Sequence, residues 1–455
     1  MAREPATPVI FSRLTEGYIA LLLSLFLLWP GRGGYAAITM EKFRLFLLLT
    51  TIYTAGMLIL MLELWLVGRW RPPVLRTLWV KAALPQKLIL LFWLWSGIST
   101  LCSPYRQTAF YGTGRLDGFA SLSLYCLLFL LVSIFGRPAK WQLWVFGISM
   151  SLCCGLALVQ LAGYNPLTLY PAGMTYYDGF VLYAGQFLGT IGNVDLLAAV
   201  LCVAIPLFWV SLLRLYDPKR FLLLIPLLLC LAVLLLSRVE AGFVGVFGGA
   251  VLTFPVVANV SRQSRKRLVI GAGGVILLAL VFIYCWGSHL PGFLYELSEL
   301  LHGRWDDRFG SSRLYIWRNV LPLLADRPLL GGGPDTLGLR CQLQFERFNE
   351  ELGVLLTSLV DNAHNEYLNI ALNQGIPALL FYLGALFSAA ARWVKNAPTN
   401  PPCAILGATV LGYCMQAFFG LPSVISTPYL WLAFALMLCA DRTPASIPSK
   451  RRNKT

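Results

Sequence analysis

Long apolar runs, separated by short polar segments, recur along almost the whole chain. Because a helix needs about 20 predominantly apolar residues to cross a bilayer, these runs predict about twelve transmembrane helices. They cover residues 17–30, 43–67, 86–102, 119–136, 142–163, 189–213, 221–236, 239–257, 268–287, 365–391, 403–420 and 426–440. The predicted fold class is therefore all-α, a polytopic transmembrane helical bundle.

One long polar segment, residues 288–363, interrupts this pattern. Its apolar residues recur at helical spacing: Leu314, Trp317, Leu321 and Leu324. With Ser311 or Ser312 as N-cap, the spacing predicts an amphipathic helix that ends before Pro328. A triple-glycine turn follows at residues 331–333, and its backbone N–H groups could cradle a phosphate, although a Walker lysine is missing.

The chain is accordingly expected to divide into four regions. These are residues 1–287 with spans one to nine, 288–363 as a large extracytoplasmic loop containing short amphipathic helices, 364–440 with spans ten to twelve, and 441–455 as a basic cytoplasmic tail.

The composition excludes a soluble protein, since 58% of the 455 residues are hydrophobic and 13% are charged, with a mean hydropathy of +0.69. The net charge of +15 would suggest nucleic acid in a soluble chain, but here the sorting of basic residues between loops explains it, so no nucleic-acid partner is expected. The eleven cysteines form no C-x-x-C pair, so no structural metal site is predicted. No cofactor is expected either.

Loop charges predict the orientation. With the N-terminus inside, 23 of the 36 Lys and Arg residues fall in inner segments. Twelve of the thirteen outer basic residues are arginines, among them Arg115, Arg238, Arg313 and Arg318. Arginine's planar fork suits phosphate or carboxylate recognition, although the chain as a whole is also rich in arginine.

On this topology, polar residues from distant segments gather at the outer side. Asn193 and Asp195 lie at the outer end of the sixth span, and Arg238 lies in an outer hairpin with Glu240. Each has a structural alternative: Asn193 as a helix cap or a packing contact, and Arg238 with Glu240 as an interfacial turn pair. Ionisable groups at membrane depth are costly, so their agreement on one side favours a functional site.

His364 is the first residue of the predicted tenth span, with Asn362 or Asp361 as its cap. One face of this helix becomes small after the first turn: His364, Leu368, Ala371, Gly375 and Ala378. Such a face lets another helix approach closely. A histidine there can act as a base near neutral pH, or it can simply anchor the helix at the interface.

The stretch "HNEYLNIALNQGIPA" resembles a signature of the O-antigen ligase and polymerase superfamily of bacterial membrane glycosyltransferases. In that signature a histidine and a polar residue precede Gly-x-x-Gly, and Ala378 replaces the second glycine here. Weaker similarities follow the family's order in "GTIGNVDLLAA", "LLLSRVEAGFVG" and "SSRLYIWRNVLPLLADRPLLGGGPDT", and "YGTGRLDGF" is similar to a segment of some relatives.

The resemblance implies a metal-independent transfer of a glycan from undecaprenyl pyrophosphate to an acceptor hydroxyl, on the outer face of the cytoplasmic (inner) membrane. It implies that the catalytic residues are His364, which is the base or orients the acceptor, and Arg238 and Arg313, which bind the pyrophosphate and stabilise it as the leaving group. The further substrate-binding candidates are Arg115, Arg318, Asn193, Asp195 and Asn365. The acceptor would be a lipid, a glycan or a protein, and membrane lipids would surround the spans. Ligase and polymerase remain alternatives.

A transporter or flippase of lipid-linked glycan is the rival interpretation, because twelve spans are typical of transporters. The chain shows no internal repeat, and its polar residues gather on one side only. Both features favour the enzyme. A structural scaffold would explain the spans but not the arginines.

Overall fold

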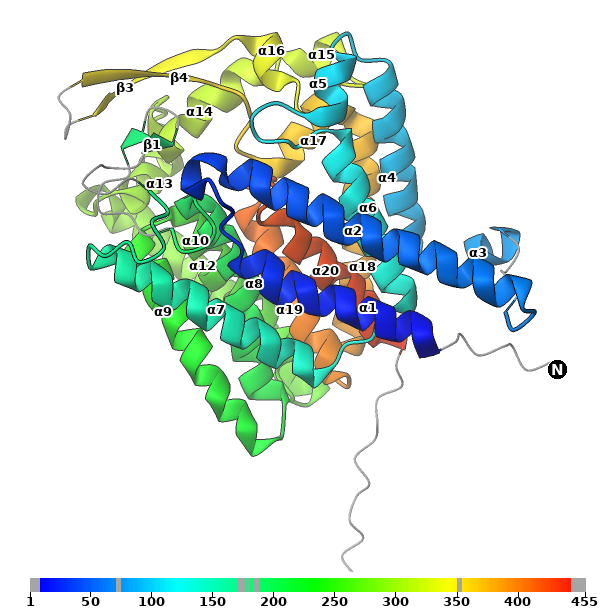
Figure 1. Cartoon of the computed structure of the whole chain (residues 1–455). Helices are drawn as coiled ribbons and strands as arrows, with labels where there is room; N and C mark the ends of the chain where they lie inside the picture. The colour runs from blue at the N-terminus through cyan, green and yellow to red at the C-terminus, as the bar shows by residue number, and fades with distance from the viewer. Residues whose placement is uncertain are drawn as a thin grey trace, which may run out of the picture.

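The computed structural model describes residues 9–70, 75–170, 177–178, 181–182, 188–349 and 354–442. Most of the predicted basic tail, residues 443–455, lies outside the described residues, as do residues 350–353 of the predicted large loop. The described chain is a helical bundle with two short antiparallel hairpins (Figure 1).

Eight helical segments of the described chain are long and apolar enough to cross a membrane. They are Val9–Phe26 (α1, Val9–Leu21, and the π-helical turn η1, Leu22–Phe26), α2 Gly34–Leu66, α7 Lys140–Leu161, α8 Val194–Arg214, Pro218–Ser237 (η2, Pro218–Leu223, and α9, Leu224–Ser237), Glu240–Val257 (α10, Glu240–Phe243, η3, Val244–Gly248, and α11, Gly249–Val257), Arg262–His289 (α12, Arg262–Trp286, and η4, Gly287–His289) and α18 Ile376–Asn396.

The other four predicted spans are also helical but shorter or less apolar: α4 Leu84–Leu101, α6 Phe119–Phe135, α19 Pro401–Gln416 and α20 Thr427–Arg442. The prediction of a helical membrane bundle is thus confirmed, while the count of twelve spans is not.

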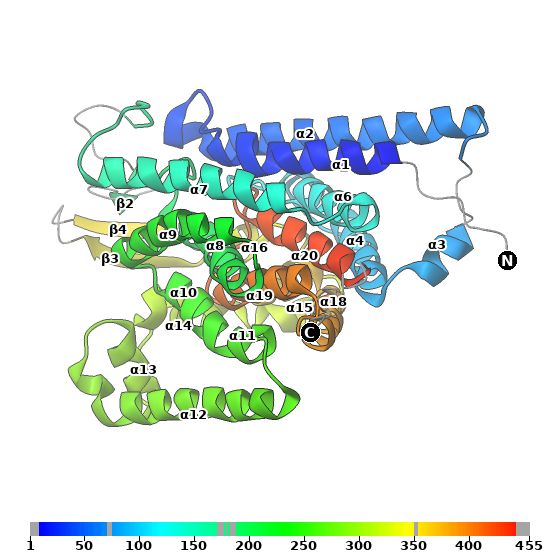
Figure 2. The same cartoon turned by 90° about the horizontal axis from the view of Figure 1, so that it is seen from below.

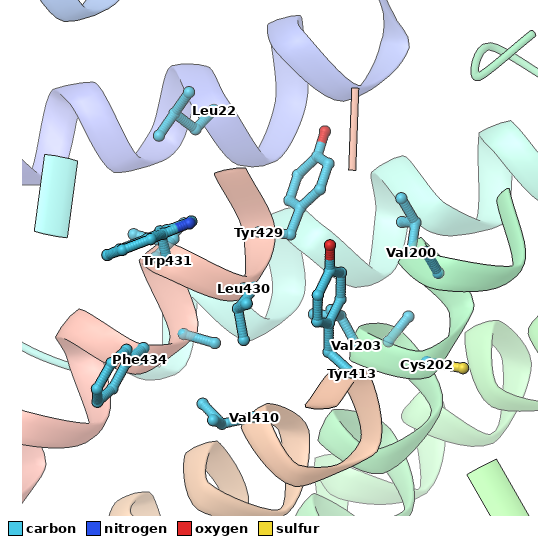
Figure 3. Close-up of a cluster of buried hydrophobic side chains, with 14 of the residues drawn as sticks. Leu22, Val200, Cys202, Val203, Val410, Tyr413, Tyr429, Leu430, Trp431 and Phe434 are labelled. Atoms are coloured by element: carbon cyan, nitrogen blue, oxygen red, sulfur yellow. The ribbon is translucent and has the colours of Figure 1, made fainter. Parts of the chain in front are cut away.

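The core of the bundle surrounds α20, whose residues from Thr427 to Ala440 are all buried. This helix packs against α6 through aromatic rings, such as Phe129 and Phe434 with centroids 4.7 Å apart. It also packs against α19 (Figure 3). On its other side α19 crosses α8 at Gly412, where an added Cβ would lie 2.6 Å from the carbonyl oxygen of Cys202. Small residues at such crossings let membrane helices approach closely.

Lys42 is the exception to the sorting of lysines toward the inner side, and the structure explains it. Its side chain is fully buried, and its ammonium donates hydrogen bonds to the carbonyl oxygens of Phe26 (2.5 Å) and Leu27 (2.9 Å). These carbonyls lie at the end of η1, where helical partners run out. Lys42 is therefore a buried helix cap.

Helix α12 stands apart from the bundle (Figure 2). None of its residues is buried, and it packs chiefly against its chain neighbours α11 and α13, Phe293–Leu301. Its apolar surface is therefore available to lipid along its whole length.

The predicted large loop is folded and lies at one end of the bundle (Figure 1). It contains α13, α14 (Phe309–Val320), α15 (Leu323–Asp326), α16 (Leu337–Cys341) and the hairpin of β3 (Gln344–Asn349) with β4 (Val354–Leu359). A small hydrophobic core centred on Ile316, Val320 and Leu337 joins it to α17, Glu366–Gln374. The remaining elements are α3 Leu75–Lys81, α5 Arg106–Tyr111, β1 Tyr177–Asp178 and β2 Val181–Leu182.

The helix predicted over residues 311–327 is present but divided. Gly310, Ser311 and Ser312 have positive φ angles of 62°, 56° and 65°, so regular helix begins at Arg313. Neither Ser311 nor Ser312 makes a recorded capping bond, and α14 ends at Val320, just before Pro322 opens α15. The β3–β4 hairpin was not expected from the sequence.

Candidate functional site

His364 lies in the loop that joins β4 to α17. The predicted continuous tenth span is wrong in two respects. Asn365, and not Asn362 or Asp361, caps α17, since its side-chain oxygen accepts from the Leu368 amide at 3.0 Å. His364 therefore precedes the helix, with φ +48° and its backbone N–H donating to Asn362 Oδ1 at 2.9 Å. A non-glycine residue held in this conformation is a feature often found at functional sites.

Gly375 ends α17 and separates it from α18. Its φ of +90° is favourable only for glycine, and a Cβ there would lie 2.0 Å from the Leu329 carbonyl oxygen. The predicted small face from His364 to Ala378 is therefore not one helix face. Gly375 instead lets the segment at Leu329 pass across the junction between α17 and α18. There the carbonyl oxygen of Pro328 accepts a hydrogen bond from the Ile376 amide at 2.8 Å.

A narrow crevice brings three predicted site residues together: Asp195, Arg313 and His364. They come from the first turn of α8, the first regular turn of α14 and the loop before α17. Gln416 at the end of α19 and Ala241 in α10 also line the crevice. Segments more than 100 residues apart in the chain thus meet at one end of the bundle.

Arg313 is held in this crevice with part of its hydrogen-bonding capacity unused. Its Nη1 donates to the Gly310 carbonyl oxygen at 2.7 Å, while its Nε is buried without a hydrogen-bond partner among the described residues. Burial lowers the pKa of the guanidinium, and the carboxylates of Asp195, Glu240 and Glu296 oppose that shift. A buried donor without a partner is costly, which suits a group that awaits an anionic ligand.

His364 is kept neutral by the same surroundings. Burial and, after it, the positive charges of Arg115 and Arg313 together lower the pKa of its imidazole to about 3, against the opposing charge of Asp361. The imidazole therefore has a free lone pair throughout the physiological range. An anion bound beside the two arginines would raise its pKa and strengthen it as a base.

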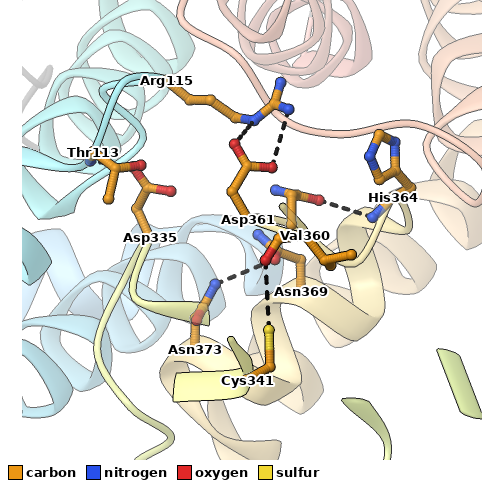
Figure 4. Close-up of polar contacts among 10 residues, drawn as sticks. Thr113, Arg115, Asp335, Cys341, Val360, Asp361, His364, Asn369 and Asn373 are labelled. Atoms are coloured by element: carbon orange, nitrogen blue, oxygen red, sulfur yellow. Dashed lines mark hydrogen bonds and ion pairs between the residues drawn. The ribbon is translucent and has the colours of Figure 1, made fainter. Parts of the chain in front are cut away.

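Arg115 makes a two-pronged ion pair with Asp361, three residues before His364 (Figure 4). Its Nε donates to Asp361 Oδ2 at 2.7 Å and its Nη2 donates to Oδ1 at 3.0 Å. The Arg115 loop is itself fixed by buried Asp335, which accepts from the Thr113 amide at 2.6 Å and the Thr113 hydroxyl at 2.9 Å. Burial raises the pKa of Asp335 despite these bonds. This network ties "YGTGRLDGF" to the histidine loop.

The remaining predicted site residues lie outside the crevice or have structural partners. Arg238 is exposed in a left-handed turn (φ +54°) after α9, and no hydrogen bond or ion pair of its side chain is found among the described residues. Arg318 is also exposed and binds Asp307 at 2.6 Å.

Asn193 caps α8 by accepting from the Asp195 and Leu196 amides. Assignment to substrate binding stays a prediction for Arg238, Arg318, Asn193 and Asn365.

The triple-glycine turn does not offer its amides to a phosphate, which excludes the phosphate cradle as its role. The N–H groups of Gly331, Gly332 and Gly333 donate to the carbonyl oxygens of Arg327, Leu372 and Asn373, respectively. An added Cβ on Gly331 would lie 2.4 Å from the Asn373 oxygen. Glycine is needed here so that the loop backbone can lie directly on the end of α17.

Sequence reasoning missed two carboxylates, because their partners are distant in the chain. The sequence indicates Asp361 only as a helix cap, and no local pattern indicates Asp335. Glu366 is buried, with Oε1 accepting from the Tyr382 hydroxyl at 2.7 Å and Oε2 lacking a hydrogen-bond partner within the described chain. In the described ranges no three His, Cys, Asp or Glu side chains are grouped so as to hold a metal.

The apolar helices define a multi-pass membrane protein, and the crevice gives it a polar site, with Asp195, Arg313 and His364, at one end of the bundle. Residues 225–383 match the family model described as O-Antigen ligase. This match confirms the resemblance to the O-antigen ligase and polymerase superfamily and supports a membrane glycan transferase of the O-antigen-ligase type. The matched range includes Arg238, Arg313 and His364 but not Arg115 or Asp195. No curated protein matches the chain.

Proposed function

We propose that the protein transfers a glycan from undecaprenyl pyrophosphate to an acceptor hydroxyl at the extracytoplasmic face of the cytoplasmic membrane. The observation that carries the proposal is the crevice in which the unpaired Arg313 Nε and the neutral imidazole of His364 lie together. A cation for a leaving pyrophosphate and a base for an attacking hydroxyl are the two groups that this reaction needs.

In the proposed step, the acceptor oxygen forms a bond to the anomeric carbon while the bond from that carbon to the phosphate oxygen breaks. His364 accepts the proton of the acceptor hydroxyl. Undecaprenyl pyrophosphate leaves with the bonding electron pair, and the guanidinium of Arg313 stabilises the charge that develops on it. Arg238, exposed near the same end of the bundle, is assigned to the distal phosphate.

Substrate binding would also prepare the base. The pKa of His364 is low partly because Arg115 and Arg313 repel a proton there. A pyrophosphate at Arg313 offsets that repulsion, so the imidazole becomes more basic only when the donor is present. The acceptor would then be deprotonated in the occupied site and not in the empty one.

The proposal is tested with purified protein in liposomes, given purified lipid-linked glycan and candidate acceptors. We expect His364→Ala and Arg313→Ala each to lower kcat by about 100-fold or more, as for removal of a general base or a charge stabiliser. Arg313→Lys keeps the charge but not the planar fork, and we expect partial activity. The matched control is Arg44→Ala, an exposed arginine (68%) paired with Glu41.

Two results would overturn the proposal. One is full turnover by both alanine variants while the proteins remain folded in the membrane. The other is movement of lipid-linked glycan across the bilayer without any glycan transfer, which would identify a flippase.

A further inference from the structure

A second hollow, of about 470 Å³ and open to solvent, lies in the predicted large loop. It is formed by α13 and the turn before α14, and neither His364 nor Arg313 lines it. Three aromatic rings line it: Tyr295, Trp305 and Phe309. Trp305 is 75% exposed, which is unusual for so large an apolar side chain in a folded loop.

The aromatic rings share the hollow with paired charges. Glu299 accepts two hydrogen bonds from Arg304, both at 2.7 Å, and Asp306 accepts from Arg308 at 2.8 Å. The hydrogen bond from Arg308 lowers the pKa of Asp306 to about 2, so this pair is charged at physiological pH. Each pair fixes its side chains while leaving further lone pairs and N–H groups for a ligand.

The hollow is also connected to the crevice by a short chain of hydrogen bonds. Glu296, which lines the hollow, accepts from the Gly310 amide at 2.7 Å. The carbonyl oxygen of the same Gly310 accepts from Arg313 Nη1 at 2.7 Å. A molecule whose charged end lies at Arg313 could thus extend past Gly310 into the hollow.

We propose that this hollow binds the saccharide part of the lipid-linked glycan, with a sugar ring against Trp305 and its hydroxyls on the two ion pairs. The proposal rests on the proposed function. A sugar presents both an apolar C–H face and a ring of hydroxyls that donate and accept hydrogen bonds, which fits aromatic rings beside fixed carboxylates and guanidinium groups.

The charge of the hollow specifies the class of sugar. Three carboxylates, Glu296, Glu299 and Asp306, face two guanidinium groups, those of Arg304 and Arg308. The lining therefore carries a net negative charge, which disfavours a polyanionic saccharide and favours one without acidic groups. A lipid surface is the rival partner for an exposed tryptophan, but five charged side chains in a concavity do not suit the apolar part of a bilayer.

The test uses the full-length protein in detergent and a fluorescent oligosaccharide released by mild acid from the cell's own lipid-linked glycan. The probe lacks lipid and pyrophosphate, so its binding depends on the saccharide alone. We expect saturable binding that Trp305→Ala weakens about tenfold, the effect of losing one central aromatic contact. Asp306→Asn should also weaken binding. The control Tyr164→Ala removes an equally exposed ring (68%) outside the hollow and should change nothing.

The outcomes separate this proposal from the proposed function. In turnover assays, Trp305→Ala should raise KM for lipid-linked glycan with little change in kcat, whereas His364→Ala should abolish turnover but bind the probe normally. Probe binding without any turnover would refute the transferase and leave the hollow standing. Unchanged probe binding and KM in a folded Trp305→Ala protein would refute the hollow alone. Quenching of tryptophan fluorescence by brominated lipid in nanodiscs that is lost in Trp305→Ala, while this variant binds the probe as the unsubstituted protein does, would identify a lipid anchor instead.

Discussion

The ion pair of Arg115 with Asp361 joins two loops 246 residues apart, and it can be tested by a double-mutant cycle. Arg115→Ala and Asp361→Ala would be made singly and together, so that the interaction energy is separated from the other contacts of each side chain. The pair fixes the loop that ends in His364. We therefore expect both single variants to lower stability and also to lower kcat.

The size of the interaction energy follows from the geometry. Each of the two charge-assisted hydrogen bonds, of 2.7 and 3.0 Å, would be worth about 1.5–3 kcal/mol if well buried, whereas exposed ion pairs are worth about 0.2–1 kcal/mol. The two side chains are 32% and 39% exposed, so solvent screens the pair considerably. We expect an interaction free energy of about 1–2 kcal/mol.

Unfolding free energies of the four proteins would be measured in mixed micelles by titration with a denaturing detergent. The matched cycle uses Lys140 and Asp217, which make one contact of 3.5 Å with 66% and 38% of their side chains exposed. Its interaction energy should be below about 0.5 kcal/mol. An Arg115–Asp361 value no larger than that of the control pair would refute the view that this ion pair holds the histidine loop.

Three further predictions concern single positions. His364 is one of three histidines, and its ¹³C NMR signal should show a neutral imidazole down to about pH 5, because burial and two arginines lower its pKa to about 3. Inorganic pyrophosphate should raise that pKa. Titration of His364 near pH 6.5 in the free protein would contradict the assigned surroundings. Gly333→Ala should destabilise the protein by about 2–4 kcal/mol in the same unfolding titration, because φ is +105° and the added Cβ would lie 2.7 Å from Ser103 Oγ and Ala109 Cβ. The control Gly303→Ala, at a position with φ +74° and open space around the added Cβ, should cost about 1 kcal/mol. Equal costs for the two variants would contradict the packing of the triple-glycine turn. Glu366→Gln keeps an acceptor for the Tyr382 hydroxyl and should change the free energy of unfolding by less than about 1 kcal/mol. Glu366→Ala removes that acceptor and should cost about 2–4 kcal/mol. A large loss of stability in the Gln variant would show that the carboxylate is needed as a charge.

Much of the helical framework follows from the sequence. Apolar runs specify helices because a backbone in lipid must satisfy its own hydrogen bonds, and this depends only on local composition and length. The superfamily was likewise recognisable from "HNEYLNIALNQGIPA" and the ordered weaker segments, and the match of residues 225–383 confirms it. The position of Asn193 just before a helix also follows from a local rule, since its side chain can reach the first free amides.

Only the tertiary structure decided which residues meet. Nothing near Arg115 in the chain indicates Asp361 as its partner, and nothing near Gly331 indicates that its amide is already occupied. The break at Gly375 has a local signal in Pro377 two residues later, but the positive φ of Gly375 and its contact with the segment at Leu329 depend on the tertiary structure. Local patterns determine helices through short-range hydrogen bonds and burial, whereas the crevice of Asp195, Arg313 and His364 depends on how those helices pack over more than 100 residues of chain.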